Sequence, residues 1–115
     1  MEENLIIFES IFEGGTFHGA EISIMEIIND VPTPVALNGS NVVCQMKKDS
    51  TVHAEYKTAD NTISVSMNKI IFPKHNPTLK AGLYEFDFNI ILPDGTKEPG
   101  IGQGEWTILE PKTKR

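Results

Sequence analysis

The stretch from Leu83 to Leu92 constrains the fold of this chain most, because apolar and polar residues alternate along it. Its apolar members are Tyr84, Phe86, Phe88, Ile90 and Leu92, and the polar residues between them are Glu85, Asp87 and Asn89. Successive side chains of a β-strand point to opposite faces of the sheet, whereas a helix repeats its apolar face every three or four residues. The two-residue period therefore predicts a β-strand whose aromatic residues face a core.

Shorter runs along the chain predict further strands. Residues 41–48 place Val42, Cys44 and Met46 on one face, residues 62–67 place Ile63, Val65 and Met67 inward, residues 21–28 place Ile22 and Ile24 on one face, and residues 105–109 form a last strand. Turn-forming residues separate these runs at 32–34, 38–40 and 93–96, and the prolines within 73–80 indicate a longer connection. No segment of ten or more residues has a clean helical period. Short strands at roughly ten-residue spacing predict an all-β fold, an antiparallel β-sandwich of about seven strands.

Tyr84 opens the longest predicted strand, two residues after Gly82. In immunoglobulin-like sandwiches a tyrosine at this place forms a tyrosine corner, in which its hydroxyl bonds to the backbone a few residues upstream. We therefore expect an immunoglobulin-like topology with Tyr84 in this role. The alternative is that Tyr84 is simply a large residue facing the core, and neither interpretation makes it catalytic.

The length of 115 residues suits one domain, and we expect residues 1–110 to form it. Residues 111–115 are expected to be a short basic tail that carries Lys112, Lys114 and Arg115. Membrane insertion is not expected, because no run approaches the roughly 20 apolar residues of a spanning helix. The single cysteine, Cys44, excludes an intrachain disulfide and is expected to be buried.

The charge balance argues against nucleic acid as a partner. Sixteen acidic and ten basic residues give a net charge of −6, and a field of that sign repels phosphate backbones. The first four residues include two acids and no base, unlike the positively charged start of a secretory signal. We therefore expect synthesis in the cytoplasm without a signal peptide.

No group of residues has the pattern of a catalytic or metal site. The three histidines, His18, His53 and His75, lie too far apart in sequence for the short spacings of histidine metal sites. Ser50 and Asp49 lie near His53, but neighbours on a strand point to opposite faces and the glycines of a nucleophile elbow are missing.

Glu85 and Asp87 are spaced like a pair of catalytic carboxylates along one strand. Acids that alternate with apolar residues are, however, the usual way in which an antiparallel strand meets water. The expectation is therefore a protein that is not an enzyme and that uses no cofactor.

Glycines cluster within residues 12–17 and 99–104, as they do in loops that bind phosphate. A phosphate loop needs a helix N-terminus directly after the glycines, and here a strand is predicted after both clusters. Turns, bulges and sharp bends explain these glycines at lower cost. The residues expected to act structurally are Gly14, Gly15, Gly39, Gly82, Tyr84, Asp94, Gly95 and Gly104.

Tyr56 and Trp106 are the aromatic residues from which a glycan-binding surface would be built. The position of Trp106 between Glu105 and Thr107 predicts that its ring faces the core. An exposed ring that stacks on a sugar stays open as the alternative.

A series of short motifs resembles small immunoglobulin-like domains encoded by tailed bacteriophages and prophages. In order, the motifs are residues 12–17, 33–39, 45–48, Leu79 together with 82–87, 93–96 and 102–108. They cover most of residues 11–110 and also look like the N-terminal sandwich of some phage baseplate and receptor-binding proteins. The chain departs from the pattern at Ala36, where the family favours an acid, and at Lys47, where it favours arginine.

The resemblance implies a non-enzymatic structural or accessory protein of a phage particle, located in the virion at the tail, baseplate, neck or capsid surface. Its partners would be other phage structural proteins and copies of itself. Leu5, Ile6, Ile7 and Phe8 would suit docking, because an exposed apolar strand can pair with a neighbour's sheet edge. The alternative is that these four residues form the first strand of their own sheet.

Two other functions stay open at the level of the sequence. A glycan-binding module for host adhesion would use Tyr56 and Trp106. An acidic inhibitor that imitates DNA would concentrate its acids on one face, whereas the sequence scatters them over nearly every segment.

Overall fold

The computed structural model describes residues 5–111, without the side chains of Leu5 and residues 98–102. The only helical element in this part is the three-residue turn η1 (Thr58–Asp60), and no helix there is long enough to cross a membrane. The strands are β1 (Leu5–Ile7), β2 (Ile11–Phe12), β3 (Ala20–Ser23), β4 (Met25–Ile28), β5 (Val31–Pro34), β6 (Asn41–Lys48), β7 (Thr51–Lys57), β8 (Ser64–Ser66), β9 (Lys69–Phe72), β10 (Gly82–Ile91) and β11 (Lys97–Leu109). The predicted all-β fold is confirmed, although these described residues form eleven strands instead of about seven. The basic residues predicted to form a tail, together with residues 1–4, lie outside the described residues.

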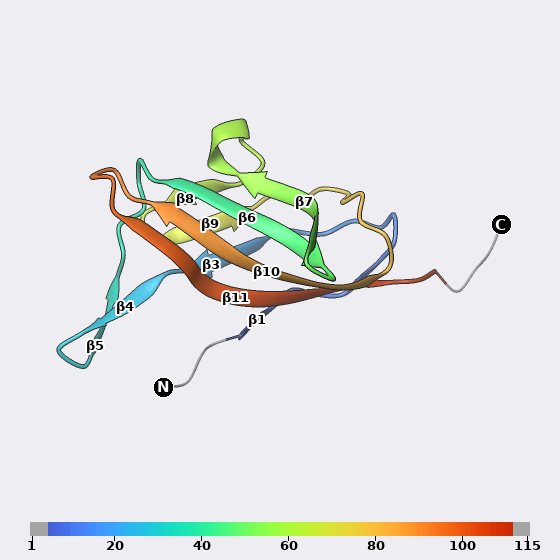
Figure 1. Ribbon diagram of the computed structural model, residues 1–115, viewed down its shortest axis with the longest axis horizontal. Coiled ribbons are helices and arrows are strands. Elements are labelled where there is room, and N and C mark those ends of the chain that lie inside the picture. The colour runs from blue at the N-terminus through green and yellow to red at the C-terminus, as the bar shows by residue number, and fades with distance from the viewer. Residues whose placement is uncertain (1–4, 112–115) are drawn as a thin grey trace.

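The larger sheet has the strand order β1-β11-β10-β6-β7, with β2 also paired to β11 (Figure 1). The turn predicted at 93–96 joins β10 to β11, and Gly95 completes it with a φ of +90° that favours glycine. Asp94 Oδ1 accepts a hydrogen bond from the Thr96 amide at 2.9 Å. Hydrogen bonds from Thr96 also hold the pKa of the Asp94 carboxyl below its ordinary value. Both residues therefore stabilise the turn between β10 and β11.

One edge of the larger sheet is parallel, which corrects the expectation of a wholly antiparallel fold. Both β1 and β2 run parallel to β11, with Ile7 opposite Glu105 and Ile11 opposite Ile108. Antiparallel neighbours follow from tight hairpins, but no hairpin joins the first strands to the last one. The N-terminal segment is therefore free to lie along β11 in the same direction.

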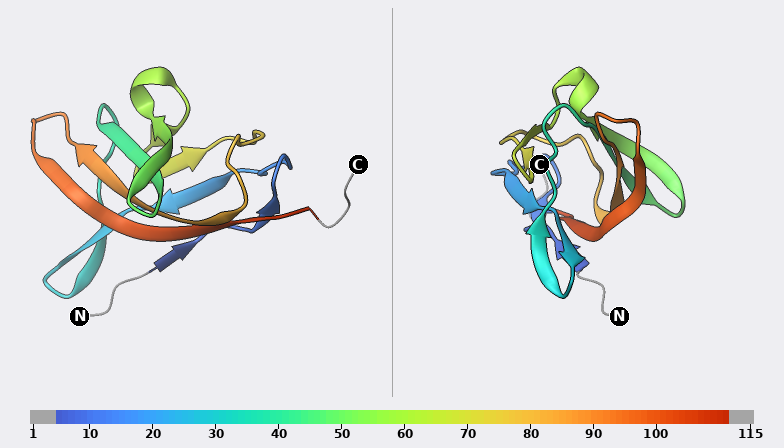
Figure 2. Two further views of the ribbon diagram at one scale, coloured as in Figure 1. Left: turned by 45° about the vertical axis from the view of Figure 1, so that its right-hand side comes forward. Right: turned by 90° about the vertical axis from the view of Figure 1, so that its left-hand side faces the viewer.

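The smaller sheet has the order β3-β9-β8 and faces the larger sheet across the core (Figure 2). β4 and β5 form a separate two-stranded ribbon that projects away from both sheets (Figure 1). We call this ribbon, residues 25–34, the arm. Asn29 and Asp30 form its tip, with φ of 52° and 65°, as in the two-residue turns that suit a β-hairpin.

Pro32 and Pro34 lie in β5, where the sequence predicts a loop. Opposite them in the arm are Ile27 and Met25, while Glu26 pairs with Thr33. In an antiparallel pair only alternate residues exchange hydrogen bonds with the partner strand. Because the Val35 amide donates to the Ile24 carbonyl at 3.1 Å, residues 24, 26 and 28 are the bonded ones. Both prolines therefore occupy positions where β5 needs no N–H, which makes them compatible with a strand.

The core lies between the two sheets and consists largely of the residues predicted to face inward. Alternate residues of four strands are buried there: Tyr84, Phe86, Phe88 and Ile90 on β10, Val42, Cys44 and Met46 on β6, Ile22 on β3, and Trp106 and Ile108 on β11. Met67 is the exception, because it is exposed although the alternation predicts it inward. It lies in the turn between β8 and β9 with φ of 59°, so the two-residue period ends before it.

The thiol of Cys44 is expected to react with alkylating reagents only when the protein unfolds. Burial raises the pKa of this thiol, and the carboxylate of Asp87 adds to the rise, so little thiolate forms in the folded state. The labelling rate with iodoacetamide should therefore follow the unfolded fraction across a urea titration. A Cys44→Ala/Ser66→Cys variant, with its thiol at an exposed position, is the control that should react at once. Rapid labelling of the folded wild type would contradict the buried position.

Tyr84 makes the backbone contact predicted for it. Its hydroxyl donates a hydrogen bond to the Lys80 carbonyl at 2.8 Å, four residues upstream, and its ring is buried. Burial raises the pKa of Tyr84 above its ordinary value. The contact ties the start of β10 to the connection that precedes it.

Tyr84→Phe is expected to lower the free energy of unfolding by about 1 kcal/mol, because it removes this one bond and keeps the ring. Urea unfolding followed by the fluorescence of the single tryptophan measures the change. An unchanged stability would show that the bond contributes nothing, and a loss comparable to removal of the whole ring would indicate that Phe is not a conservative replacement here.

Candidate docking surface

The two aromatic residues from which a glycan surface would be built are both buried. This is the position predicted for Trp106, and it corrects the alternative of an exposed ring that stacks on a sugar. The Trp106 ring is fully enclosed, and its Nε1 donates to the Glu9 carbonyl at 3.1 Å. The Tyr56 hydroxyl lies 2.8 Å from His75 Nε2, and burial raises the pKa of Tyr56 to about 12. Neither ring presents a face to a sugar, because alternation along β7 and β11 turns both into the core.

The hydrogen bonds around Tyr56 assign the tautomer of His75. His75 Nδ1 lies 2.8 Å from the Pro73 carbonyl, which can only accept, so the neutral ring carries its proton on Nδ1. Nε2 is then the acceptor for the Tyr56 hydroxyl. These bonds fasten the 73–80 connection to β7, so His75 has a structural position.

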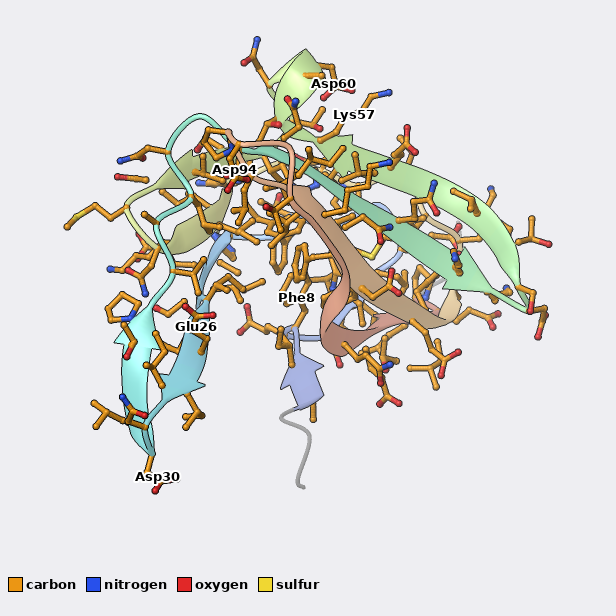
Figure 3. All side chains as sticks on the ribbon, turned by 60° about the vertical axis from the view of Figure 1, so that its left-hand side comes forward. Phe8, Glu26, Asp30, Lys57, Asp60 and Asp94 are labelled. Atoms are coloured by element: carbon orange, nitrogen blue, oxygen red, sulfur yellow. The ribbon has the colours of Figure 1, made fainter. Side chains whose placement is uncertain are left out.

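The predicted docking strand is divided between core and surface. Leu5, Ile6 and Ile7 form β1 and pair with β11 of their own sheet, as the alternative interpretation expects. Ile7 is 72% exposed, whereas Phe8 is 4% exposed and packs among other aromatic rings (Figure 3). Phe8 is therefore a core residue and is not available to a neighbour, which corrects its assignment to docking.

The remaining predicted structural residues lie at turns or close contacts. Gly14 and Gly39 have φ of +82° and +83°, a Cβ on Gly15 would come 2.9 Å from the Phe12 carbonyl oxygen, and a Cβ on Gly82 would come 3.0 Å from the Lys48 side chain. A Cβ on Gly104 would collide with the ring of Phe86. The atoms that an added Cβ would meet all belong to neighbouring segments of the same chain.

Titratable side chains are spread over several elements of the described residues. No three of the described His, Cys, Asp and Glu side chains come together as metal ligands. The outer face of the larger sheet has a shallow open hollow of about 350 Å³, in which Glu85 pairs with Glu105 on one side and with Lys47 on the other. Like charges placed directly opposite each other are unfavourable, and these side chains meet water.

The arm exposes several large apolar side chains to water. Met25, Ile27, Ile28 and Val31 are between 46% and 67% exposed, and no residue of β4 or β5 is buried. Cross-strand pairing places Met25 beside Pro34 and Ile27 beside Pro32, so these four residues share one face without a polar side chain. The opposite face carries Ile28 and Val31 together with Glu26 and Thr33. Large apolar residues gathered at an exposed place usually mark a contact with another molecule.

The base of the arm is held by bonds to the turn between β8 and β9. The Ile24 amide donates to the Asn68 carbonyl at 2.8 Å, and the Leu37 amide donates to the Met67 carbonyl at 2.7 Å. The Met67 amide in turn donates to Asn38 Oδ1 at 3.0 Å. The arm therefore leaves the body from a fixed base. The sequence did not lead us to predict this surface, although it has apolar residues on both sides of residues 29–30 and prolines at 32 and 34.

No protein-family model, characterised protein or solved structure matches this chain.

Proposed function

We propose that this chain is a non-enzymatic structural or accessory protein of a bacteriophage particle that acts by docking to other proteins. Its place would be the tail, baseplate, neck or capsid surface, and its partners would be other phage structural proteins and copies of itself. The phage assignment is supported by the ordered motifs of the sequence, and the docking by the arm.

We further propose that the fold is an immunoglobulin-like sandwich. Support comes from the strand orders β1-β11-β10-β6-β7 and β3-β9-β8, which suit the two sheets of a variable-type immunoglobulin domain with its first strand parallel to its last. The bond from the Tyr84 hydroxyl to the Lys80 carbonyl lies at the start of β10, where such domains have their tyrosine corner. The arm is then an extension of the loop that joins the two sheets.

The exposed apolar arm is the observation that carries the docking function. Apolar surface left in water is unfavourable by roughly 25 cal/mol for each Å². A partner that covers the exposed arm residues therefore forms a favourable complex, and these residues are Met25, Ile27, Ile28 and Val31. The two other candidate functions lack such support. A glycan-binding surface would need Tyr56 and Trp106, and both rings are buried. An acidic inhibitor that imitates DNA would need its acids on one face, but they are dispersed: Asp60 and Asp94 lie well away from Asp30 at the arm tip (Figure 3).

Mass spectrometry of purified virions from a strain that carries this coding sequence tests the proposal. The protein should be present at a stoichiometry comparable to that of other minor virion proteins, and should be lost when the coding sequence is deleted. An Ile27→Asp/Val31→Asp variant, which makes the arm polar, should be depleted from particles, whereas Val52→Asp on the exposed part of β7 should be retained. If the wild-type protein were absent from virions, the phage assignment would be rejected.

A further inference from the structure

Among the described strands, one edge is open over nine residues. β3 is the terminal strand of its sheet, and β4 continues it through Ile24 into the arm. β9 and β5 both lie on the same side of this run, because the Ile24 amide donates toward β9 and the Ile24 carbonyl accepts from Val35 next to β5. No described strand pairs with the other side. We call this side, residues 20–28, the open edge.

The alternation of hydrogen-bonded residues along this run shows which backbone groups of the open edge point outward. Ile22 directs its amide and carbonyl groups toward β9, Ile24 directs its amide toward Asn68 and its carbonyl toward Val35, and Glu26 and Ile28 direct theirs toward β5. The odd-numbered residues point the other way: Glu21, Ser23, Met25 and Ile27. Each of these four residues has an N–H and a C=O aimed away from the sheet, in the array that an added strand would need.

The two outer edges of the arm differ in a way that favours pairing at β4. Prolines, lysines and bulges are the usual means by which an edge strand is kept from pairing. β5 has Pro32 and Pro34 at the outward positions, so it offers no outward amide there. The open edge has neither proline nor lysine between residues 20 and 28. β5 is thus protected, whereas β4 and β3 are not.

We propose that the open edge pairs with the open edge of a second copy of this chain, in an antiparallel dimer. The inference names one partner for the docking function proposed above and rests on it. The two three-stranded sheets would join through their β3–β4 runs into one continuous sheet. Each arm would then lie beside β3 of the other copy.

A register centred on Ile24 fits the residues of both copies. All nine residues overlap, Glu21 faces Ile27, Ser23 faces Met25, and Ile22 faces Glu26. The outward residues meet outward residues, as hydrogen bonding across the dyad requires. No acid stands opposite an acid, so the like-charge penalty of cross-strand pairs is avoided even though each copy has a net charge of −6.

The stability of the arm gives a second reason for the pairing. An isolated two-stranded ribbon is only marginally stable in water, and a third strand is usually needed. The arm has two strands and no buried residue, and the second copy supplies the missing neighbour. Stable interfaces use about 20–30 residues and about 800 Å² on each side, which nine residues do not reach. The dimer is therefore weak, with a dissociation constant between about 10 μM and 1 mM.

Sedimentation equilibrium over a range up to about 1 mM, together with amide exchange by NMR, tests the dimer. Met25→Pro removes one outward amide, which counts twice in a symmetric dimer, and should weaken association by at least about tenfold. Met25→Val keeps the amide and loses the same side chain, so it is the matched control and should still dimerise. In the wild type, protection that grows with concentration should be confined to the amides of the four outward residues.

A wild type that stays monomeric at about 1 mM overturns the proposal, and so does a dimer that Met25→Pro leaves intact. Circular dichroism and one-dimensional NMR of Met25→Pro establish that the variant is folded, and Ile27→Pro gives an independent second block of the same edge. Failure here is distinct from failure of the proposed function. If the protein is monomeric but present in virions, only the dimer proposal is rejected. If it is dimeric but absent from virions, only the phage assignment is rejected.

Discussion

Replacing Phe8 by alanine is expected to lower the free energy of unfolding by about 3–5 kcal/mol, the usual cost of removing a buried aromatic side chain. The centroid of its ring lies 4.7 Å from that of Phe86, 5.1 Å from those of Phe17 and Phe72, and 5.4 Å from that of Trp106. Phe86 and Trp106 belong to the larger sheet and Phe72 to the smaller one. Phe8 therefore joins the two sheets, and its removal leaves a cavity that neither sheet fills alone.

The neighbouring residue provides a matched control for this variant. Ile7→Ala changes an aliphatic side chain of the same segment that is 72% exposed, and should alter the stability by less than about 0.5 kcal/mol. Urea unfolding of both variants, followed by tryptophan fluorescence and confirmed by circular dichroism, compares them directly. If the segment detached to dock elsewhere, the two variants would have similarly small effects. That result would reject the core position of Phe8.

The contrast between these neighbours shows what alternation along the chain reveals. Apolar residues recur at every second position from Val42 to Met46 and from Tyr84 to Ile90, and they are buried in the strands β6 and β10 as predicted. For residues 5–8 the run is wholly apolar and the period is missing. The sequence then permits both core and surface, and only the pairing of β1 with β11 decides between them.

Strands with an interrupted pattern escaped prediction for physical reasons. In β7 a register shift opposite Met46 and Lys47 exposes Val52, while Tyr56 faces the core, so apolar residues fall on both faces. In β5 two prolines resemble a loop, and their compatibility with a strand depends on which side of β5 is bonded. Information of this kind lies in the partner strand and not in the segment itself.

The arm lay beyond sequence reasoning for a different reason. An apolar residue is expected to be buried, and residues 21–28 are predicted as one strand with Ile22 and Ile24 on one face, a register that Met25 and Ile27 do not fit. The bonds of Ile24 to Asn68 and Val35 direct the following residues away from the core. What the sequence could supply was the composition of the surface, and what it could not supply was the direction in which the surface points.

Gly104→Ala is expected to lower the free energy of unfolding by about 1–3 kcal/mol, as overpacking of a filled core usually does. Gly104 lies on β11 directly opposite Phe86 of β10, and an added methyl group would run into the Phe86 ring. Cross-strand packing of an aromatic ring over a glycine is a known way to compensate for the missing side chain. The ring cannot move aside easily, because it also packs at 4.7 Å from Phe8 and 5.8 Å from Phe88.

The reason for this cost can be tested by a double-mutant cycle with Phe86→Ala. In the Phe86→Ala background the added methyl group meets no ring, and alanine is preferred over glycine in a strand by roughly 0.5–1 kcal/mol. Gly104→Ala should therefore change sign, from destabilising in the wild type to neutral or stabilising in the variant. If Gly104→Ala lowered the free energy of unfolding equally in both backgrounds, the need for glycine would arise from the backbone of β11 and not from the Phe86 ring. Because Phe86 also packs against Phe8, a change of sign would link the need for glycine at this position to the aromatic core that joins the two sheets.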